Sequence, residues 1–241
     1  MSDPKILFLD CETIARPFTT SREKIRAEDT AVVVFQYAWG EKGKAHAVSV
    51  GDFPADYKKD PFNDKKVLKE AAKIILQADI IVGHYASGFD KRILRTRFIL
   101  NGFEDAAQHI HKIPLVDTCT TARSIFAINS CSLRYLAKTL GLTPKLESEN
   151  SYWVGVMRSC PKAIKDMVKY GLGDIVTLQE LYRYIKRYMK NHPRMNYDKG
   201  GCPQCGSGDT IKWGFYFRGN ARHQRLKCKD CNADFKGAKV K

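Results

Sequence analysis

The 241-residue sequence lacks any hydrophobic run that approaches the roughly 20 residues of a membrane-spanning helix. Residues 1–4 contain no basic side chain, and the first apolar stretch, residues 6–9, is too short for a secretory signal. Internal repeats and long low-complexity segments are absent as well. We therefore expect a cytoplasmic globular protein with no membrane partner, whose eight cysteines are mostly reduced.

Acidic residues are scarce in one part of the chain. Residues 1–180 contain 26 basic and 22 acidic residues, whereas residues 181–241 contain 15 basic and only 4 acidic ones. Most of the net charge of +15 therefore belongs to the last quarter of the chain. A basic appendage on a nearly balanced domain favours a polyanionic partner such as nucleic acid, although a solvated lysine-rich tail gives the same count.

The order of the apolar segments predicts the fold class. Runs rich in β-branched and aromatic residues predict strands over residues 5–10, 30–39, 45–50, 80–83 and 115–118. Helical spacing and capping residues predict helices over residues 64–79, 89–100, 132–140, 161–170 and 174–190. We therefore expect an α/β domain with a mixed β-sheet flanked by helices over residues 1–192, a linker over 193–200 and a small domain over 201–241.

Four carboxylates lie near the ends of predicted elements. Asp10 and Glu12 follow the first strand, and residues at i and i+2 of an extended segment point the same way. Asp90 and Asp174 lie near the starts of two predicted helices. Such carboxylates can bind divalent cations through hard oxygen ligands. The structural alternatives are an exposed strand end for the first pair and helix N-caps for the other two.

Three segments resemble the motifs of one nuclease superfamily. FLDCET, IVGHYASGFDKRIL and YGLGDIVTLQELY resemble the first, second and third motifs of the DEDD superfamily of 3′–5′ exonucleases, in its tyrosine variant. The segments LVDT and CSLRYLAKTLGL resemble the connecting region of the polymerase-B-like branch. The resemblance covers roughly residues 5–190, and relatives include the proofreading domain of family B polymerases and RNase D. It implies an RNase H-like fold.

The resemblance also implies the site residues. Two Mg²⁺ or Mn²⁺ ions would be held by Asp10, Glu12, Asp90 and Asp174, and Tyr170 would orient the attacking water. The basic residues Lys91 and Arg92 follow Asp90 and are candidates to hold substrate phosphates. Asp117, near the end of a predicted strand, could be a fifth member of this acidic set, but we expect a structural role for it first.

The sequence departs from the family pattern in two places. Tyr85 stands where the second motif usually has Asn, and a tyrosine cannot copy the paired donor and acceptor of an amide. Gly171 and Gly173 weaken the helix between Tyr170 and Asp174.

Four of the cysteines form two close pairs. Cys202, Cys205, Cys228 and Cys231 form two C-x₂-C motifs separated by 22 residues, a spacing that predicts one structural Zn²⁺ ion. A redox dithiol pair is the weaker alternative. Strand-like runs at residues 210–218 and 222–227 surround Gly219 and Asn220, and the whole segment resembles a zinc ribbon. A segment this small has little core, so we expect the metal to stabilise it.

Aromatic and basic residues alternate between the two cysteine pairs. Aromatic rings can stack on bases and cations can contact phosphates, which favours binding of a single strand. The candidates are Trp213, Arg218, Arg222, Arg225 and Lys227. A ribbon that binds another protein, such as a replication or repair partner, is the alternative.

Together these features predict a metal-dependent 3′–5′ exonuclease that acts on DNA, or on RNA, and uses the basic ribbon to hold the strand. Small nucleases of this kind occur in bacteria and their phages, so the resemblance implies a prokaryotic or phage-infected cell. Two alternatives remain open: an RNA-trimming nuclease or structure-specific endonuclease on the same fold, and a catalytically decayed module that only binds nucleic acid.

Overall fold

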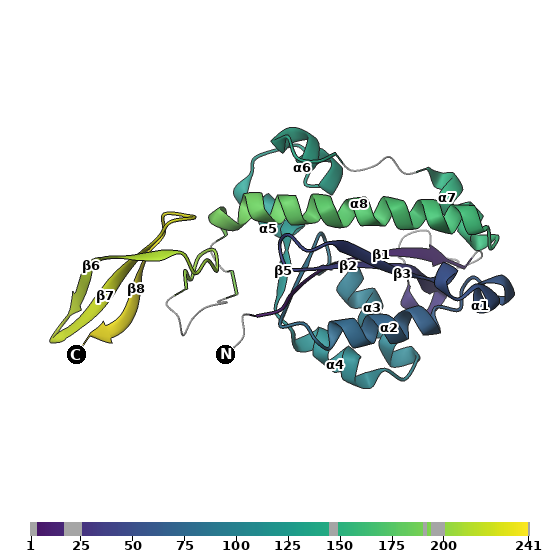
Figure 1. Ribbon diagram of the computed structural model, residues 1–241, viewed down its shortest axis with the longest axis horizontal. Helices are drawn as coiled ribbons and strands as arrows, with labels where there is room; N and C mark the ends of the chain where they lie inside the picture. Colours follow the sequence, from purple (N-terminus) through teal and green to yellow (C-terminus); the bar gives the residue numbers. More distant parts are fainter. Residues whose placement is uncertain (1–3, 17–25, 145–148, 190–191, 194–200, 241) are drawn as a thin grey trace.

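The structure is a computed structural model, and it describes residues 4–16, 26–144, 149–189, 192–193 and 201–240. Apart from Pro193, the predicted linker over 193–200 lies outside the described residues, as does Lys190 at the predicted end of the last helix. A larger α/β body and a smaller β-sheet follow one another along the chain (Figure 1).

A five-stranded mixed sheet forms the centre of the body. Its strands have the order β3-β2-β1-β4-β5. β1 pairs antiparallel with β2 and parallel with β4, while β3 and β5 are the two edge strands. The strands span Ile6–Ala15 (β1), Thr30–Trp39 (β2), Ala45–Ser49 (β3), Ile80–Gly83 (β4) and Leu115–Asp117 (β5). The predicted mixed sheet is confirmed.

Helices cover both faces of this sheet (Figure 1). The long helix α8 (Pro161–Ile185) lies on one face together with α5 (Thr118–Ile125) and α6 (Leu133–Leu140). The other face is covered by α2 (Lys65–Ile75), α3 (Asp90–Leu100) and α4 (Glu104–Lys112). Two further short helices are α1 (Pro54–Lys59) and α7 (Asn150–Met157).

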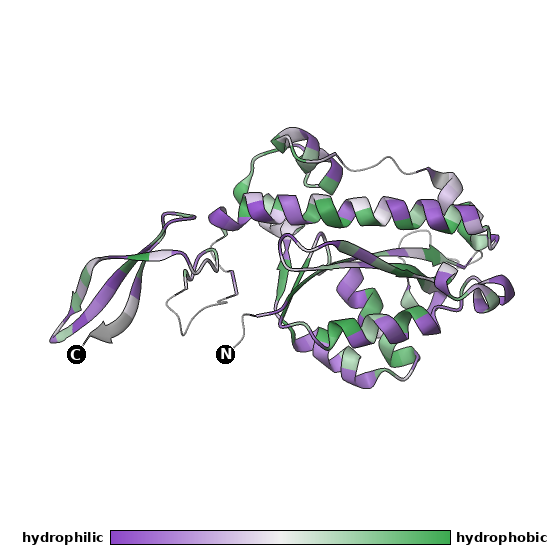
Figure 2. Ribbon diagram, in the orientation of Figure 1, coloured by the Kyte–Doolittle hydropathy of each residue, from purple (hydrophilic) through white to green (hydrophobic). Residues whose placement is uncertain are grey.

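The helix sequences explain this packing. α2 buries Val67, Leu68 and Ala71, which recur at helical spacing, and leaves its lysines outside. Along α8, hydrophobic and hydrophilic residues alternate at a similar period (Figure 2). Ser132 caps α6 by accepting a bond from the backbone N–H of Tyr135 at 3.3 Å, as a capping serine should.

One helix prediction was wrong in an instructive way. Residues 161–170 and 174–190 were expected as two helices, but α8 is continuous across Gly171 and Gly173. A glycine inside a helix costs about 1 kcal/mol relative to alanine, which close packing against the sheet can offset. The short helices α1, α4, α5 and α7 were not predicted.

The small sheet has three antiparallel strands in the order β6-β7-β8. They span Thr210–Arg218 (β6), Ala221–Cys228 (β7) and Asp234–Val240 (β8), of which only the first two were predicted. Gly219 in the β6–β7 turn has φ +54°, a conformation that glycine adopts without strain. Among the described residues, no helix is long and apolar enough to cross a membrane.

Candidate functional site

β1 carries two of the four candidate carboxylates on the sheet face that α8 covers. Phe8 lies on this face, because its ring packs edge-on against Tyr182 of α8 at 5.2 Å between centroids. Asp10 and Glu12 follow at alternate positions and therefore point to the same side. The sequence predicted that this strand ends at residue 10. In the structure β1 continues through Glu12, and β2 pairs with it as far as Ala15.

α8 supplies the third carboxylate. Because the helix is unbroken, Tyr170 and Asp174 are one turn apart and share its buried side, with exposed fractions of 6% and 2%. Asp174 lies in the helix interior, which excludes the N-cap alternative. One carboxylate oxygen from each of Asp10, Glu12 and Asp174 lies within 4.8 Å of the others.

This oxygen set fits a hard divalent cation. Two oxygens on opposite sides of Mg²⁺, each about 2.1 Å from the ion, lie about 4.2 Å apart. Three clustered carboxylates repel one another unless a cation or protons lie between them. Glu12 and Asp174 are also buried, which strengthens this repulsion. The side chains present therefore suit Mg²⁺ or Mn²⁺.

Asp90 lies beside this group rather than within it. Its Oδ1 accepts a hydrogen bond of 3.0 Å from the backbone N–H of Cys11, between the two acids of β1. The carboxylate therefore does not cap its own helix. Burial first, and then the negative charge of Asp10, raise the pKa of Asp90 well above its usual range. A cation near Asp10 would oppose this shift, since it favours the charged carboxylate.

Gln36 of β2 is a further polar neighbour, which sequence reasoning missed. It pairs in register with Asp10, is completely buried, and places its side-chain amide 3.5 Å from a carboxylate oxygen of Asp10. In the alternative amide orientation its nitrogen donates to the backbone oxygens of Asp10 and Val34 at 2.9 and 3.0 Å. Either way the amide fixes β1 at Asp10. The sequence offered one indication of this residue's role, because Gln36 is a single glutamine inside an otherwise apolar stretch.

Gly171 makes room for this glutamine. A Cβ atom at position 171 would lie 2.0 Å from the side-chain nitrogen of Gln36. The glycine that appeared to weaken the helix therefore lets α8 approach β2 at the site, one residue after Tyr170. Trp153 of α7 packs edge-on against Tyr170 from another direction, with ring centroids 6.1 Å apart.

Asp117 has the structural role that was expected. Its carboxylate accepts bonds from the backbone N–H groups of Tyr85 and Ser87 at 3.0 and 2.9 Å, and it also caps α5. It thereby holds the loop between β4 and α3. Tyr85, at the position of the usual Asn, is about half exposed and has φ +61°.

The two basic residues after Asp90 differ in their surroundings. The ammonium group of Lys91 donates to the backbone oxygen of Ile113 at 3.2 Å. Burial, and then the charge of Arg95, lower the pKa of Lys91. Arg92 is exposed. Of the two, Arg92 is the more accessible to a substrate phosphate.

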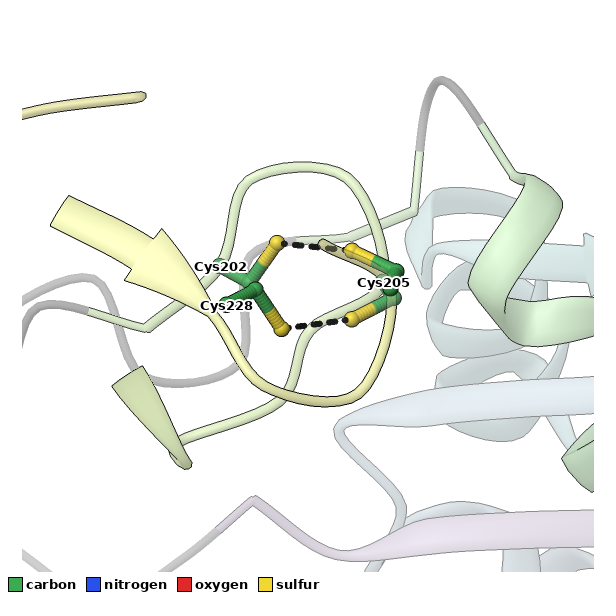
Figure 3. Close-up of side chains that lie close together, drawn as sticks. Cys202, Cys205 and Cys228 are labelled. Carbon is green, nitrogen blue, oxygen red and sulfur yellow. Dashed lines mark hydrogen bonds between the residues drawn. The ribbon is translucent and has the colours of Figure 1, made fainter. Parts of the chain in front are cut away.

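The four paired cysteines form a compact cluster. Cys202 and Cys231 have sulfur atoms 3.5 Å apart, as do Cys205 and Cys228, and all four sulfurs lie within 4.8 Å of one another (Figure 3). Four thiolates about 2.3 Å from a tetrahedral Zn²⁺ ion are about 3.8 Å apart, whereas a disulfide needs about 2.05 Å. The cluster therefore fits one Zn²⁺ ion.

The residue after each cysteine pair suits the backbone of its turn. Gly206 and Asn232, which each follow the second cysteine of a pair, have φ +75° and +59°. Glycine and asparagine tolerate this left-handed conformation better than other residues. Burial raises the pKa of Cys231 to about 11. Bound Zn²⁺ would counteract this, because the ligand is the thiolate.

The surface of the small sheet pairs aromatic rings with cations. Lys227 lies 4.7 Å from the ring centre of Trp213, and Arg222 lies 3.6 Å from that of Phe215. Trp213 is 52% exposed, and Arg218 is exposed as well. Arg225 is different, because its guanidinium group is bound to Asp234.

Comparisons with known proteins give a family and a fold. A family model described as the RNase H superfamily matches residues 7–186. Among solved structures, the family B DNA polymerase from the hyperthermophilic archaeon Pyrobaculum calidifontis is similar, with a TM-score of 0.54 and 16% sequence identity. The match covers 77% of this chain but only 26% of the polymerase chain, and at this identity it shows the fold alone. No curated protein sequence matches the chain.

Proposed function

The chain belongs to the RNase H superfamily, and from this membership and the acidic site we propose that the protein is a two-metal-ion 3′–5′ exonuclease of the DEDD type. It would hydrolyse phosphodiester bonds from the 3′ end of DNA. The observation that carries the proposal is the convergence of Asp10, Glu12 and Asp174 from two elements, with Asp90 bound to the backbone of Cys11 between them.

Each side chain of the site would have its own role in the reaction. Asp10, Glu12, Asp90 and Asp174 would hold Mg²⁺ or Mn²⁺, which supplies positive charge at the attacking and leaving oxygens of an in-line displacement. In that displacement a water oxygen bonds to phosphorus and the bond from phosphorus to the 3′ oxygen breaks. The 3′ oxygen leaves with a proton, and a nucleoside 5′-monophosphate is released.

Tyr170 would orient the attacking water. Its burial on the same helix side as Asp174, one turn earlier, supports this role, and Trp153 limits the positions that its ring can take. The 3′–5′ direction rests on the Tyr-x-x-x-Asp resemblance. The likeness in fold to a polymerase is consistent with DNA as substrate, and RNA remains the second candidate.

We further propose that residues 201–241 form a zinc ribbon that holds the nucleic acid, separated from a nuclease domain over residues 1–192 by the linker 193–200. The four-sulfur cluster supports the zinc site. The exposed Trp213 and the cations around it support contact with a strand. A ribbon that binds a replication or repair protein is the alternative.

Digestion of labelled oligonucleotides tests the proposal. Single- and double-stranded DNA and RNA carrying a 5′ label are incubated with Mn²⁺, and we expect a ladder that shortens from the 3′ end. Asp10→Ala and Asp174→Ala should each reduce the rate on the order of 1,000-fold. Asp105→Ala, an exposed acid on α4, is the matched control and should act like the parent.

The other outcomes point to the alternatives. Internal cuts would favour a structure-specific endonuclease, and shortening of RNA alone would favour an RNA-trimming enzyme. Absence of product, with an affinity for DNA that does not depend on Mn²⁺, would identify a module that only binds.

A further inference from the structure

Tyr85 combines features that rarely occur together. It lies in the loop between β4 and α3, its φ is +61°, and its side chain is 49% exposed. A bulky residue with positive φ is strained, and asparagine adopts this conformation more readily. Since exposure gives the ring little burial energy in return, packing alone does not account for a tyrosine here.

The loop holds Tyr85 in this conformation through several bonds. Asp117 accepts from its backbone N–H at 3.0 Å. The Tyr85 carbonyl in turn accepts from the N–H groups of Gly88 and Phe89, each at 3.0 Å. The backbone is therefore fixed at both ends of the residue. Strain that is over-determined in this way is typical of functional sites.

In this loop the ring of Tyr85 lies against the backbone at Gly88. A Cβ atom at Gly88 would lie 2.6 Å from Cζ of Tyr85 and 2.8 Å from Cε2, so only glycine lets the ring lie against the backbone there. The guanidinium carbon of Arg123, an exposed residue of α5, lies 6.0 Å from the ring centre. The cation lies over the ring, but farther away than Arg222 lies from the ring centre of Phe215, at 3.6 Å.

The loop that carries the ring also adjoins the acidic site along both chain and sheet. Gly83, two residues before Tyr85, ends β4, which pairs in parallel with β1 as far as Phe8, two residues before Asp10. Asp90 follows Tyr85 by five residues and binds the backbone of Cys11. The loop that carries the exposed ring thus connects β4, the parallel neighbour of β1, to α3, and these elements hold Asp10, Glu12 and Asp90.

We propose that Tyr85 is a stacking platform for an unpaired base of the nucleic-acid strand beside the scissile phosphate, with Arg123 contacting a neighbouring phosphate. This inference rests on the proposed nuclease function and adds a substrate class to it. A base can stack on the ring only when it is unpaired. The platform therefore favours single-stranded or frayed ends over fully paired ones.

Fluorescence of a modified base tests the platform directly. The Asp174→Asn protein, which binds without efficient cleavage, is titrated with a short single-stranded DNA that carries 2-aminopurine at its 3′ end. Stacking on the Tyr85 ring should quench the fluorescence. Tyr85→Phe in this background keeps the ring and should bind and quench like its parent. Tyr85→Asn removes the ring and should weaken binding about 5- to 100-fold with less quenching.

A structural role for Tyr85 predicts different results. If Tyr85 is a platform, the melting temperature of Tyr85→Asn should equal or exceed that of the Asp174→Asn parent while binding falls, because asparagine relieves the backbone strain. Unchanged affinity and quenching in Tyr85→Asn would overturn the platform. Loss of binding in Tyr85→Phe as well, with a lowered melting temperature, would also overturn it, because folding would then be the cause.

The same variants separate this inference from the proposed function. If the unsubstituted protein shows no exonuclease activity but quenching in the Asp174→Asn background still depends on Tyr85, the proposed chemistry fails and the platform stands. If the unsubstituted protein is active and its Tyr85→Asn variant retains the same KM on single-stranded and paired ends, the platform fails and the chemistry stands.

Discussion

The body and the small sheet are stabilised in different ways. The body has two apolar clusters, both built from many buried aliphatic and aromatic side chains. Among the described residues, the buried members of the small sheet's cluster are Cys202, Cys205 and Cys228, with Cys231, Ala233 and Phe235 packed against them. In the body, the candidate acids are positioned by a fold that apolar burial stabilises. In the small sheet the candidate metal site is itself the core.

This difference also explains where the exposed aromatic residues lie. Because the sulfur cluster supplies the core, β6 does not need its apolar side chains for folding. Trp213, Phe215 and Phe217 have exposed fractions of 52%, 38% and 74%. A ribbon held by a metal can leave such a row of rings free for a partner, whereas a sheet held by apolar burial would have to cover it.

The largest expected effect is on the small sheet when the proposed Zn²⁺ ion is removed. Cys205→Ser or treatment with a chelator should unfold residues 201–241, because structural Zn²⁺ contributes on the order of 10 kcal/mol to such modules. The body should keep its melting temperature, since the clusters of the two regions share no residue. Limited proteolysis with calorimetry on the full chain checks both.

The control for this experiment is Cys131→Ser, a half-buried cysteine of the body that should leave the zinc content unchanged. Burial raises the pKa of Cys231, so protons compete with the metal, and zinc affinity should fall as the pH falls. A body that melts together with the ribbon would contradict the comparison.

The next largest effect concerns an ion pair inside the body. Arg97 of α3 donates from its Nε to Asp64 at 3.0 Å, Asp64 is 1% exposed, and it also accepts from the backbone N–H of Val32. Arg97→Met leaves this carboxylate buried without its cation, so it should destabilise the protein by about 3–5 kcal/mol in urea unfolding. Arg95→Met, on the same helix but more exposed, should cost well under this. If Arg97→Met and Arg95→Met lowered the free energy of unfolding equally, the ion pair between Arg97 and Asp64 would not be what stabilises the body here.

A smaller change in stability is expected at Gly171, where α8 packs on Gln36 beside the acidic site. Gly171→Ala should destabilise the body by about 1–3 kcal/mol, because its Cβ atom would overlap Gln36, although alanine is the better helix former. It should also slow the nuclease by displacing the neighbour of Asp10. Combining it with Gln36→Ala should cost less than the sum of the two single changes in a double-mutant cycle. Additive effects would mean that Gln36 and Gly171 do not contact each other as described.

Gln36 and Gly171 also show why part of the site escaped prediction. β2 and β4 were predicted to the residue, because dense apolar runs bounded by polar ones define a strand locally. The carboxylates were found through the motif resemblance. The extension of β1 through Asp10 and Glu12, and the contact of Gln36 with α8, depend on neighbours far away in sequence. No local pattern specifies such contacts, so they became visible only in the folded chain.

β8 illustrates the same limit in the small sheet. Its residues 234–240 contain one aromatic residue, a glycine and two lysines, so they have no strand-like pattern. The strand forms because β7 offers it a partner and Phe235 packs on the cysteine cluster. Short-range propensity predicted β6 and β7, which are joined by a tight turn, and missed the strand that follows the second cysteine pair.

The smallest expected effect sharpens the comparison at the ribbon surface. Arg225 is bound to Asp234 in an exposed ion pair, so Arg225→Met should leave the unfolding midpoint unchanged, in contrast to Arg97→Met in the body. Its charge is already paired, so we expect Arg218→Met to weaken DNA binding more than Arg225→Met does. Titrations at several salt concentrations measure this: losing one phosphate contact lowers the slope of log Kd against log salt by about 1. A larger slope change for Arg225→Met would mean that DNA displaces Asp234, and the ribbon would then exchange an internal ion pair for a phosphate on binding.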